Sequence, residues 1–386
     1  MTDTLLIVGG GIGGLTTALA LLRQGLKVAV FEAAAAIGDV GAGLTLGATA
    51  TRGLYALGLE DALMAAAPEQ PSASAALHYR TGEVLGGGFK DRAWTSGNPD
   101  RVHAIHRADL YAILQDAVLA LAPDALHLGH VFERFEQDAD GVTVWFEDGT
   151  TARGCALIGA DGIRSPVRTQ MFGPENPRFT GQVAYRFLVP MEKALPYMGA
   201  SIAGPYIGPG RSLMRYPLRH NTIVNCVVFA SAESWTGEGW SQRCSVEELQ
   251  NLFPGWHDDV LGLAASAPLE GTAKWALYDR DPLNTWVQGL VALLGDAAHP
   301  MLPFLGLGAA MAIEDAVVLA RAFVKLPEPG AALALYESAR APRAGLMLLE
   351  SRRQADLFRE GPGGEQQRTL TTHRERMDYD PSTVRL

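Results

Sequence analysis

The residues that could do chemistry begin at a glycine cluster near the start of the chain. Gly9, Gly11 and Gly14 satisfy the pattern G-x-G-x-x-G, directly after the apolar run 5–8. Glycines at these positions allow a sharp turn and let a pyrophosphate approach the backbone, while free N–H groups of the following helix face the phosphates. Glu32 ends the next apolar run, 18 residues after Gly14, where a ribose-binding carboxylate is expected. The pattern predicts a dinucleotide site, for NAD or FAD.

Two later loops carry carboxylates after apolar strands. Asp161 follows the strand 155–160, and Asp296 follows the strand 290–294 in the sequence Gly-Asp-Ala-Ala-His-Pro. A carboxylate at the end of a strand is well placed beside a bound nucleotide. Arg164 and Arg168 could neutralise Asp161 or attract the phosphates of a second, diffusible cofactor.

Arg107 opens a helix that the pattern predicts to run to about residue 121. A cation at a helix N-terminus opposes the helix dipole. Contact with a phosphate and a surface salt bridge are both open explanations for its position.

The composition limits the classes of partner. The chain has 386 residues, 48% hydrophobic and 19% charged, with a net charge of −10. This length allows roughly two domains, and the acidic balance argues against nucleic acid and anionic membranes. The three cysteines form no C-x-x-C pair, which indicates a reducing compartment. With no long apolar run and no room for a signal peptide before the first strand, we expect a cytoplasmic protein.

The elements that must position these groups suggest two interleaved parts. Strand, glycine-turn and helix patterns near both ends of the chain predict a dinucleotide-binding part. Short β runs at 182–189, 212–218 and 222–230 predict a second, sheet-based domain, preceded by a hairpin that turns at Thr81-Gly82. Long helices are expected over 309–324 and 331–359. The glycine-rich passage 38–47 looks too broken for a regular element, and residues 361–386 read as a loose tail.

These three motifs, in this order, resemble the FAD-dependent aromatic hydroxylases with the para-hydroxybenzoate hydroxylase fold. The resemblance covers nearly the whole chain. It is strongest to 6-hydroxynicotinate 3-monooxygenase and the salicylate hydroxylases, through Gly41-Ala42-Gly43, Tyr216-Pro217 and residues 309–316. It implies an α/β fold with a Rossmann-like FAD-binding domain, an inserted, mostly antiparallel substrate sheet and C-terminal helices. The expected parts are FAD-binding segments 1–75, 101–175 and 276–360, substrate-domain segments 76–100 and 176–275, and the tail 361–386.

The resemblance also implies roles for single residues. The glycine turn would contact the FAD pyrophosphate, Glu32 the ribose, Val131 the adenine, Asp296 the ribityl or phosphate region, and the amides of Gly308 and Ala309 the flavin pyrimidine edge. The full set of expected cofactor contacts is Gly9, Gly11, Ile12, Gly13, Gly14, Glu32, Ala33, Gly43, Arg107, Val131, Asp161, Asp296, Pro303, Gly308 and Ala309.

The activity implied is that of an NAD(P)H-dependent monooxygenase. NADH or NADPH would dock transiently and reduce FAD, and O2 would form a flavin C4a-hydroperoxide that hydroxylates a small aromatic substrate, with or without loss of a carboxylate. No metal is expected, and the histidine pairs 103/106 and 127/130 have spacings that send side chains to opposite faces of a strand. His299 is expected to pack and form hydrogen bonds. The chain could be a monomer or a homodimer.

The substrate pocket is expected between the second sheet and the flavin. Arg186 or Arg215 could bind a carboxylate through two parallel hydrogen bonds, or each could be a surface arginine. Tyr216 is the best candidate to bind a substrate hydroxyl. The expected pocket residues are Thr45, Tyr185, Arg186, Arg215, Tyr216, Pro303 and Phe304.

Three positions depart from the relatives. Thr45 and Phe304 stand where 6-hydroxynicotinate hydroxylases carry histidines, and Leu307 stands where many members have glutamine. The pocket should therefore be more apolar, which disfavours hydroxynicotinate as substrate. Two alternatives stay open: a hydroxylase of a larger apolar or polycyclic natural product, and a non-catalytic FAD-binding module.

Overall fold

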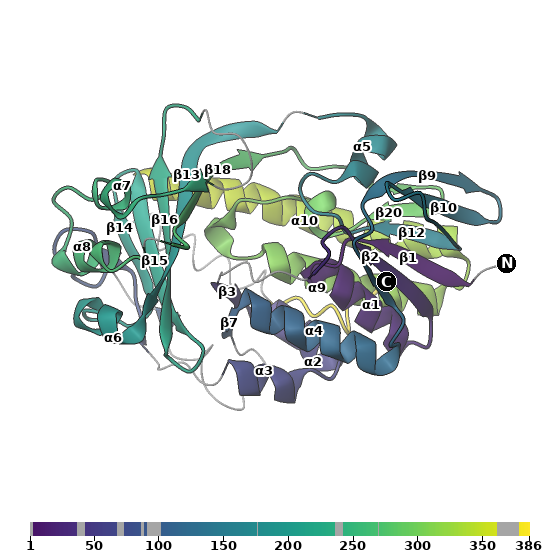
Figure 1. The fold of residues 1–386 in the computed structure, drawn as a ribbon, viewed down its shortest axis with the longest axis horizontal. Coiled ribbons are helices and arrows are strands. Elements are labelled where there is room, and N and C mark those ends of the chain that lie inside the picture. The colour runs from purple at the N-terminus through teal and green to yellow at the C-terminus, as the bar shows by residue number, and fades with distance from the viewer. Residues whose placement is uncertain are drawn as a thin grey trace.

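The computed structural model describes residues 3–36, 43–67, 73–85, 89–90, 102–175, 177–235, 242–268, 270–360 and 378–386. Two sheets dominate it, with helices packed between and around them (Figure 1). The arrangement confirms the predicted α/β fold with an inserted, mostly antiparallel sheet. Across the described residues, no helix combines the length and apolar character needed to cross a membrane.

The first sheet has six strands in the order β19-β20-β12-β1-β2-β8. Their bounds are β1 Thr4–Val8, β2 Lys27–Glu32, β8 Leu126–Leu128, β12 Ala156–Gly159, β19 Val287–Gln288 and β20 Val291–Leu293. All neighbours pair in parallel except β19 and β20. Because parallel strands end at the same edge of a sheet, the glycine turn, Glu32, Asp161 and Asp296 are brought to one edge.

Helices cover this sheet and bury its apolar residues. They are α1 Ile12–Arg23, α4 Arg107–Leu121, α9 Gly308–Lys325 and α10 Pro329–Glu360. Helix α1 packs against both α4 and α9. Strands β1, β12 and β20 carry almost only buried apolar side chains, as parallel strands covered on both faces must.

The second sheet has seven strands in the order β17-β18-β13-β16-β15-β14-β5. Their bounds are β5 Leu77–His78, β13 Arg178–Pro190, β14 Gly204–Gly208, β15 Arg211–Leu218, β16 Ile223–Ser231, β17 Gln242–Arg243 and β18 Ala273–Asp279. Helices α6 Met191–Ala194, α7 Val246–Gln250 and α8 Asp258–Ala265 lie on its outer side (Figure 1). The other face of the sheet looks toward the first domain, where β3, β7 and α9 lie.

A two-stranded ribbon connects the two parts. Strand β3, Gly43–Leu46, pairs with β7, His103–His106, and the Gly43 amide donates a 3.0 Å hydrogen bond to Oδ1 of Asn225 on β16. Ala104 of β7 packs with Tyr216 and Leu218 of β15. The ribbon therefore fixes the second sheet against the domain that carries the glycine turn.

The remaining described elements are shorter or lie outside the two main sheets. They are the helices α2 Ala48–Ala56, α3 Glu60–Ala66 and α5 Pro166–Phe172, the short helices η1 Leu195–Tyr197, η2 Gly295–Ala297 and η3 Pro303–Leu305, the meander β9 Phe132–Asp138, β10 Gly141–Phe146 and β11 Thr151–Gly154, and the pair β4 Ala73–Ser74 and β6 Phe89–Lys90.

Local predictions from the sequence are confirmed at the long helices and at the turn near Thr81, where the Gly82 amide donates to the His78 carbonyl at 3.0 Å. Two others are wrong. The passage 38–47 was expected to be irregular, but Gly43–Leu46 forms β3, and 38–42 lie outside the described residues. The tail 361–386 was expected to be loose. Residues 361–377 lie outside the described residues, but residues 378–386 pack against α2 and α9.

Candidate functional site

The glycine turn is packed too closely for any side chain. Gly9 has φ +106°, and a Cβ atom there would lie 2.3 Å from the Ala160 carbonyl oxygen. A Cβ atom on Gly14 would lie 1.9 Å from the Gly9 carbonyl oxygen. Helix α1 begins at Ile12 without a side-chain cap and without an acidic residue in its first turn. Its first amides are therefore available to an anion.

Glu32 is already held in place beside this turn. Its Oε2 accepts a 2.6 Å hydrogen bond from the Gly10 amide, and its Oε1 accepts one from the Ala34 amide at 2.9 Å. The His130 amide donates to the Glu32 carbonyl at 2.9 Å, which brings Val131 to the same edge. Val131 is 38% exposed, and Ala33 is exposed as well. These residues form an edge that fits the adenosine half of a dinucleotide.

Asp161 leaves one buried oxygen without a partner. Its Oδ2 accepts a hydrogen bond from the Val167 amide at 3.0 Å, but its Oδ1 has no partner. Burial raises the pKa of this carboxyl to about 6. A buried polar atom without a partner is expensive, so Oδ1 fits a position that is satisfied by a bound hydroxyl.

The sequence suggested that Arg168 could attract the phosphates of a second cofactor. In the structure its guanidinium is bonded within the protein instead. Its Nη1 donates to the carbonyls of Ala297 and Ala298 at 3.0 and 3.1 Å, and its Nη2 pairs with Glu175 at 2.7 Å. The guanidinium is buried and holds α5 against the loop after β20. That expectation is wrong for Arg168, while Arg164 is exposed.

Asp296 and the N-terminus of α9 meet at the same edge. A Cβ atom on Gly308 would lie 3.9 Å from Asp296 Oδ1. The Asp296 side chain is accessible, yet protein surrounds it closely enough that desolvation raises its pKa against the opposing charges of His299 and Arg107. Helix α9 has 18 residues, and no side chain caps its N-terminus. The amides near Gly308 and Ala309 are thus oriented for an electron-rich group.

Arg107 lies close enough to affect charged groups on both Asp296 of the first domain and Arg186 of the second sheet. Its guanidinium lies 5.5 Å from the Tyr111 ring centroid, and its buried Nε has no hydrogen-bond partner. Its charge lowers the pKa of Asp296 and also that of Arg186 on the second sheet. It forms no ion pair with any described residue, so no salt bridge within the described part of the chain accounts for its position.

Strand alternation decides which candidates face the pocket. On β13, Val183, Tyr185 and Phe187 pack with α7 and α8 in the outer core. Arg186, between Tyr185 and Phe187, faces the inner side, since successive side chains of a strand point to opposite faces. On β15, Tyr216 lies on the inner side with Ala104.

Two predicted pocket residues lie on the wrong face of the sheet. The buried guanidinium of Arg215 donates to the carbonyls of Gly204, Met198 and Ser201 at 2.8, 2.9 and 2.5 Å. Tyr185 packs in the outer core, where burial raises its pKa to about 12. The expectation that either contacts the substrate is wrong, because each is committed to packing behind the sheet.

The polar groups of Arg186 and Tyr216 could bind a ligand, because neither forms an ion pair or hydrogen bond with a described residue. The Arg186 guanidinium lies 5.2 Å from the Trp275 ring centroid. Desolvation lowers its pKa, with a further lowering from Arg107, and it forms no ion pair with any residue the structure describes. The Tyr216 side chain is 9% exposed, and its hydroxyl bonds to no described residue. Burial raises the Tyr216 pKa, against the opposing charge of Arg186.

Loops from the first domain lie opposite the inner face of the second sheet. Thr45 pairs with Ala104 across the β3–β7 ribbon, and its Oγ1 would lie 3.1 Å from a Cβ atom on Gly306. The Phe304 ring lies 4.6 Å from the ring of Phe229 on β16, and the neighbouring Pro303 is exposed. The loop before α9 therefore meets the inner face of the second sheet mainly through apolar groups.

Some lining residues were missed from the sequence. Met214, Asn225, Val227 and Phe229 share the inner face with Arg186 and Tyr216, as the strand register shows. Asn225 gave a usable signal, because an amide inside an apolar strand needs a partner. Its partner is the Gly43 amide, which explains why a glycine with no space for a Cβ stands there.

The histidines do not assemble a metal site within the described part of the chain. His299 packs and forms hydrogen bonds as expected, with its Nε2 2.5 Å from Asp315 Oδ2. His103 lies 2.8 Å from the Tyr55 hydroxyl and 3.2 Å from the Ala67 carbonyl through its two ring nitrogens.

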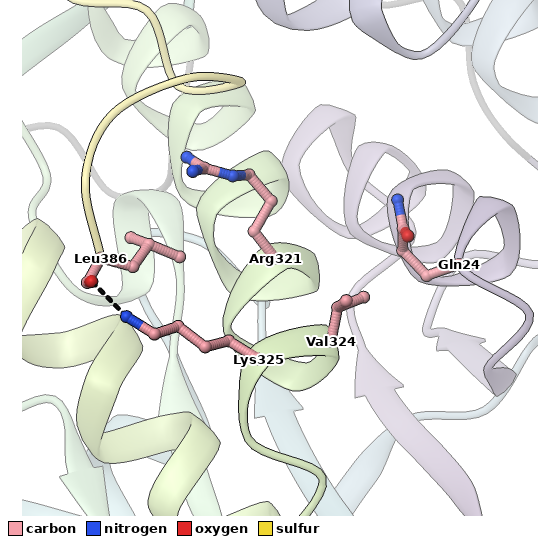
Figure 2. A pocket seen from close by; sticks show the side chains of 5 residues that line it. All are labelled: Gln24, Arg321, Val324, Lys325 and Leu386. Carbon is pink, nitrogen blue, oxygen red and sulfur yellow. Dashed lines mark hydrogen bonds between the residues drawn. The ribbon is translucent and has the colours of Figure 1, made fainter.

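A separate pocket of 270 Å³ lies at the far end of α1 and α9 (Figure 2). It is lined by Gln24, Arg321, Val324, Lys325 and Leu386. It contains none of the predicted site residues, and both helices point their C-terminal ends toward it. It is therefore distinct from the site at the glycine turn.

Known proteins share this arrangement. The family model described as "FAD binding domain" matches residues 1–351. The chain is 35% identical to 3-amino-4-hydroxybenzoate 2-monooxygenase of Streptomyces platensis over 97% of this chain and 93% of that protein. It is 36% identical to 6-hydroxynicotinate 3-monooxygenase of Pseudomonas fluorescens, covering 88% of this chain and 87% of that protein.

Solved structures of other proteins share this fold over almost the whole chain. HpxO of Klebsiella pneumoniae with FAD and uric acid superposes with a TM-score of 0.82 at 29% identity, over 98% of this chain and 93% of that one. A salicylate hydroxylase substrate complex gives a TM-score of 0.81 at 27% identity, over 98% and 96%. Given these matches and the site geometry, the chain belongs to the FAD-binding domain family and is an FAD-dependent aromatic monooxygenase.

Proposed function

We propose that the protein hydroxylates a small phenolic or heteroaromatic carboxylate, using NADH or NADPH and O2. The observation that carries this proposal is Arg186, a desolvated cation on the pocket face without a counter-ion among the described residues. A buried charge without a partner is costly. A substrate carboxylate would supply that partner through two parallel hydrogen bonds.

The names of the relatives support a carboxylated ring. They include an aminohydroxybenzoate monooxygenase, a hydroxynicotinate monooxygenase and the 3-hydroxybenzoate 6-hydroxylase of Polaromonas naphthalenivorans, which is 37% identical over 92% of this chain and 87% of that protein. Each of these substrates carries a carboxylate and a ring hydroxyl. An arginine and a tyrosine on one sheet face match those two groups.

The described residues fit FAD. The glycine turn and the uncapped start of α1 would hold the pyrophosphate, Glu32 the ribose, and Asp161 and Asp296 hydroxyl groups of the cofactor. The start of α9 would face the flavin pyrimidine edge and favour negative charge there. Bound FAD supplies the redox and oxygen chemistry.

The chain's own side chains bind and orient the ring. Arg186 would fix the carboxylate, and Tyr216 would bind the ring hydroxyl. Because burial raises the Tyr216 pKa, its hydroxyl stays protonated at neutral pH and donates a hydrogen bond rather than removing a proton. Such a donor favours a substrate phenolate, which makes the ring more electron-rich. Phe304 and Phe229 would exclude water, which limits wasteful release of hydrogen peroxide.

The test is NADH and NADPH oxidation by the FAD-loaded protein, with and without a panel of phenolic and heteroaromatic acids. Hydrogen peroxide and hydroxylated product are measured in parallel. Strong stimulation by one acid with little peroxide would support the proposal, and the product would show whether carbon dioxide is lost. Absence of stimulation by any acid would count against it.

A second candidate is hydroxylation of a larger apolar natural product. The apolar lining from Phe304 and Phe229 favours it, and Aurachin C monooxygenase/isomerase of Stigmatella aurantiaca is 36% identical over 88% of this chain and 87% of that protein. Stimulation by uncharged polycyclic phenols, and not by acids, would select this candidate.

A further inference from the structure

The C-terminal segment, residues 378–386, is bound to the FAD domain through its backbone. Three basic side chains donate hydrogen bonds to its carbonyl oxygens: Arg52 to Tyr379 at 3.2 Å, Arg321 to Pro381 at 2.7 Å and to Val384 at 2.6 Å, and Lys325 to Leu386. Figure 2 shows the last of these contacts at the end of α9. The segment is therefore held in one place along α9.

This placement puts the ring of Tyr379 over two arginines of α10. The Arg343 Cζ atom lies 3.9 Å from the ring centroid, and the Arg340 Cζ atom lies 5.2 Å from it. The Tyr379 hydroxyl is buried and has no hydrogen-bond partner. The interaction is thus made by the aromatic face, as in cation–π pairs, and not by the hydroxyl.

The two arginines are part of a buried ionic cluster with α9. Arg343 donates to both oxygens of Glu314, at 2.7 and 3.0 Å, and Arg340 Nε donates to Asp315 Oδ1 at 2.7 Å. Arg340 and Asp315 are 0% exposed and Glu314 is 1% exposed. Buried ion pairs depend strongly on geometry, so a ring that fixes both guanidinium planes bears directly on the cluster.

The other oxygen of Asp315 holds the loop that carries Asp296. Asp315 Oδ2 accepts a 3.1 Å hydrogen bond from the Gly295 amide and lies 2.5 Å from His299 Nε2. Asp296 stands between these two anchored residues and faces Gly308 at the start of α9. A continuous series of contacts therefore runs from Tyr379 through Arg340 and Asp315 to the cofactor edge.

We propose that Tyr379 is a positioning residue for the FAD site: its ring fixes Arg340 and Arg343, and through Asp315 it sets the loop 295–299. This inference concerns FAD binding and does not depend on the substrate proposed above. It predicts that a side chain distant from the cofactor controls cofactor affinity.

The test compares Tyr379→Leu with Tyr379→Phe in the full chain. FAD dissociation constants are measured by flavin fluorescence titration of apoprotein, well below the unfolding temperature. Tyr379→Leu should weaken FAD binding by about 3- to 20-fold, the range expected for loss of cation–π contacts. Tyr379→Phe should stay within twofold of the parent, because the hydroxyl has no partner. Turnover of the FAD-saturated enzyme should change little.

Controls separate this role from general stability. Tyr278→Leu removes a ring from the second sheet, where Tyr278 contacts Phe179, and should leave FAD affinity unchanged. If Tyr379→Leu does not fold, Arg343→Lys, which loses the paired hydrogen bonds to Glu314, carries the same test. In an Asp296→Ala background, Tyr379→Leu should have a smaller effect, since groups in one network are not additive. Unchanged FAD affinity in Tyr379→Leu or in Arg343→Lys, or full additivity with Asp296→Ala, would overturn the proposal.

Discussion

Arg186 of β13 and Tyr216 of β15 face the same side of the seven-stranded sheet and interact electrostatically, whereas their chain neighbours Tyr185 and Arg215 face the other side. The sheet thus separates two arginines of similar sequence context into different roles. Arg186 has no ion-pair partner among the described residues and lies on the inner face of the sheet, whereas Arg215 is bonded to backbone carbonyls.

The two arginines should respond differently to substitution by methionine. Arg215→Met leaves the carbonyls of Gly204, Met198 and Ser201 without their donor, which should lower the free energy of unfolding by at least about 2 kcal/mol. Arg186→Met removes a desolvated cation without a described counter-ion, so it should not lower the free energy of unfolding and should raise it if the unpaired charge is costly in the folded state. Urea unfolding of both variants checks this. Equal destabilisation would contradict the assigned faces.

Tyr216→Phe should keep the fold and lose substrate binding energy. Its hydroxyl bonds to no described residue, so stability should hardly change. Loss of one hydrogen bond to the substrate is worth about 1 kcal/mol, or roughly a fivefold drop in kcat/KM. Because burial raises the Tyr216 pKa, the loss should be the same between pH 6 and 8. A loss that grows with pH would instead indicate that Tyr216 acts as a base.

Asp161 should make the apoprotein less stable as pH rises. Its folded pKa is raised to about 6 from its ordinary value of 3.8, so the folded state binds the proton more tightly than the unfolded state. Stability from this group is therefore lost between about pH 4 and 6, by an amount on the order of 3 kcal/mol. Asp161→Asn should remove that slope and weaken FAD binding. Urea unfolding of the parent and Asp161→Asn apoproteins at pH 5 and pH 8 measures this pH dependence. An equal change in the free energy of unfolding in both proteins would contradict the buried position of Asp161.

Asp315 should have the opposite pH dependence. His299 and Arg340 lower its pKa to about 2 against the effect of burial, so its contribution is present above about pH 4 and is lost as the pH falls toward 2. Asp315→Asn should cost about 3–5 kcal/mol, because it removes one of the two carboxylates that pair with the buried Arg340 and also the carboxylate beside His299. Thermal unfolding at pH 7 tests the magnitude, with the exposed Asp281→Asn as the control. A variant as stable as the control would contradict the account.

The cofactor edge was largely predictable because its residues follow apolar strands. The positions of Glu32, Asp161 and Asp296 at strand ends, together with a glycine turn that leaves no space for a Cβ, fix one edge of a parallel sheet before any coordinates are known. The start of α9 was also predicted to within one residue. The expected helix began at residue 309, and α9 begins at Gly308, after the glycine turn that follows β20 and its loop.

The pocket face was harder to predict because the second sheet is buried on both sides. When both faces are covered, alternation between polar and apolar residues no longer indicates which face is which. Tyr185 and Arg186 are adjacent, as are Arg215 and Tyr216, so a shift by one residue exchanges their roles. The carbonyls that bind Arg215 lie 11 to 17 residues away along the chain, and no local pattern marks them.

The position of the C-terminal segment, residues 378–386, was also hard to predict from the sequence. Its polar sequence indicated a loose tail, but its carbonyl oxygens accept hydrogen bonds from basic side chains, and Val384 and Leu386 pack against the core without forming a periodic apolar pattern. The partners Arg52, Arg321 and Arg343 come from three different helices. Only the fold brings these cations together.

The measurement that tests the central claim most directly compares an aromatic acid with its amide in the parent protein and in Arg186→Met. The substrate found in the oxidation assay and its carboxamide are titrated, and KM and kcat are recorded, with Arg178→Met as a control on the exposed end of the same strand. If Arg186 binds the carboxylate, the parent and the control should prefer the acid by about 100-fold in kcat/KM, and Arg186→Met should lose most of that preference. A preference for the acid that survives in Arg186→Met would contradict the account.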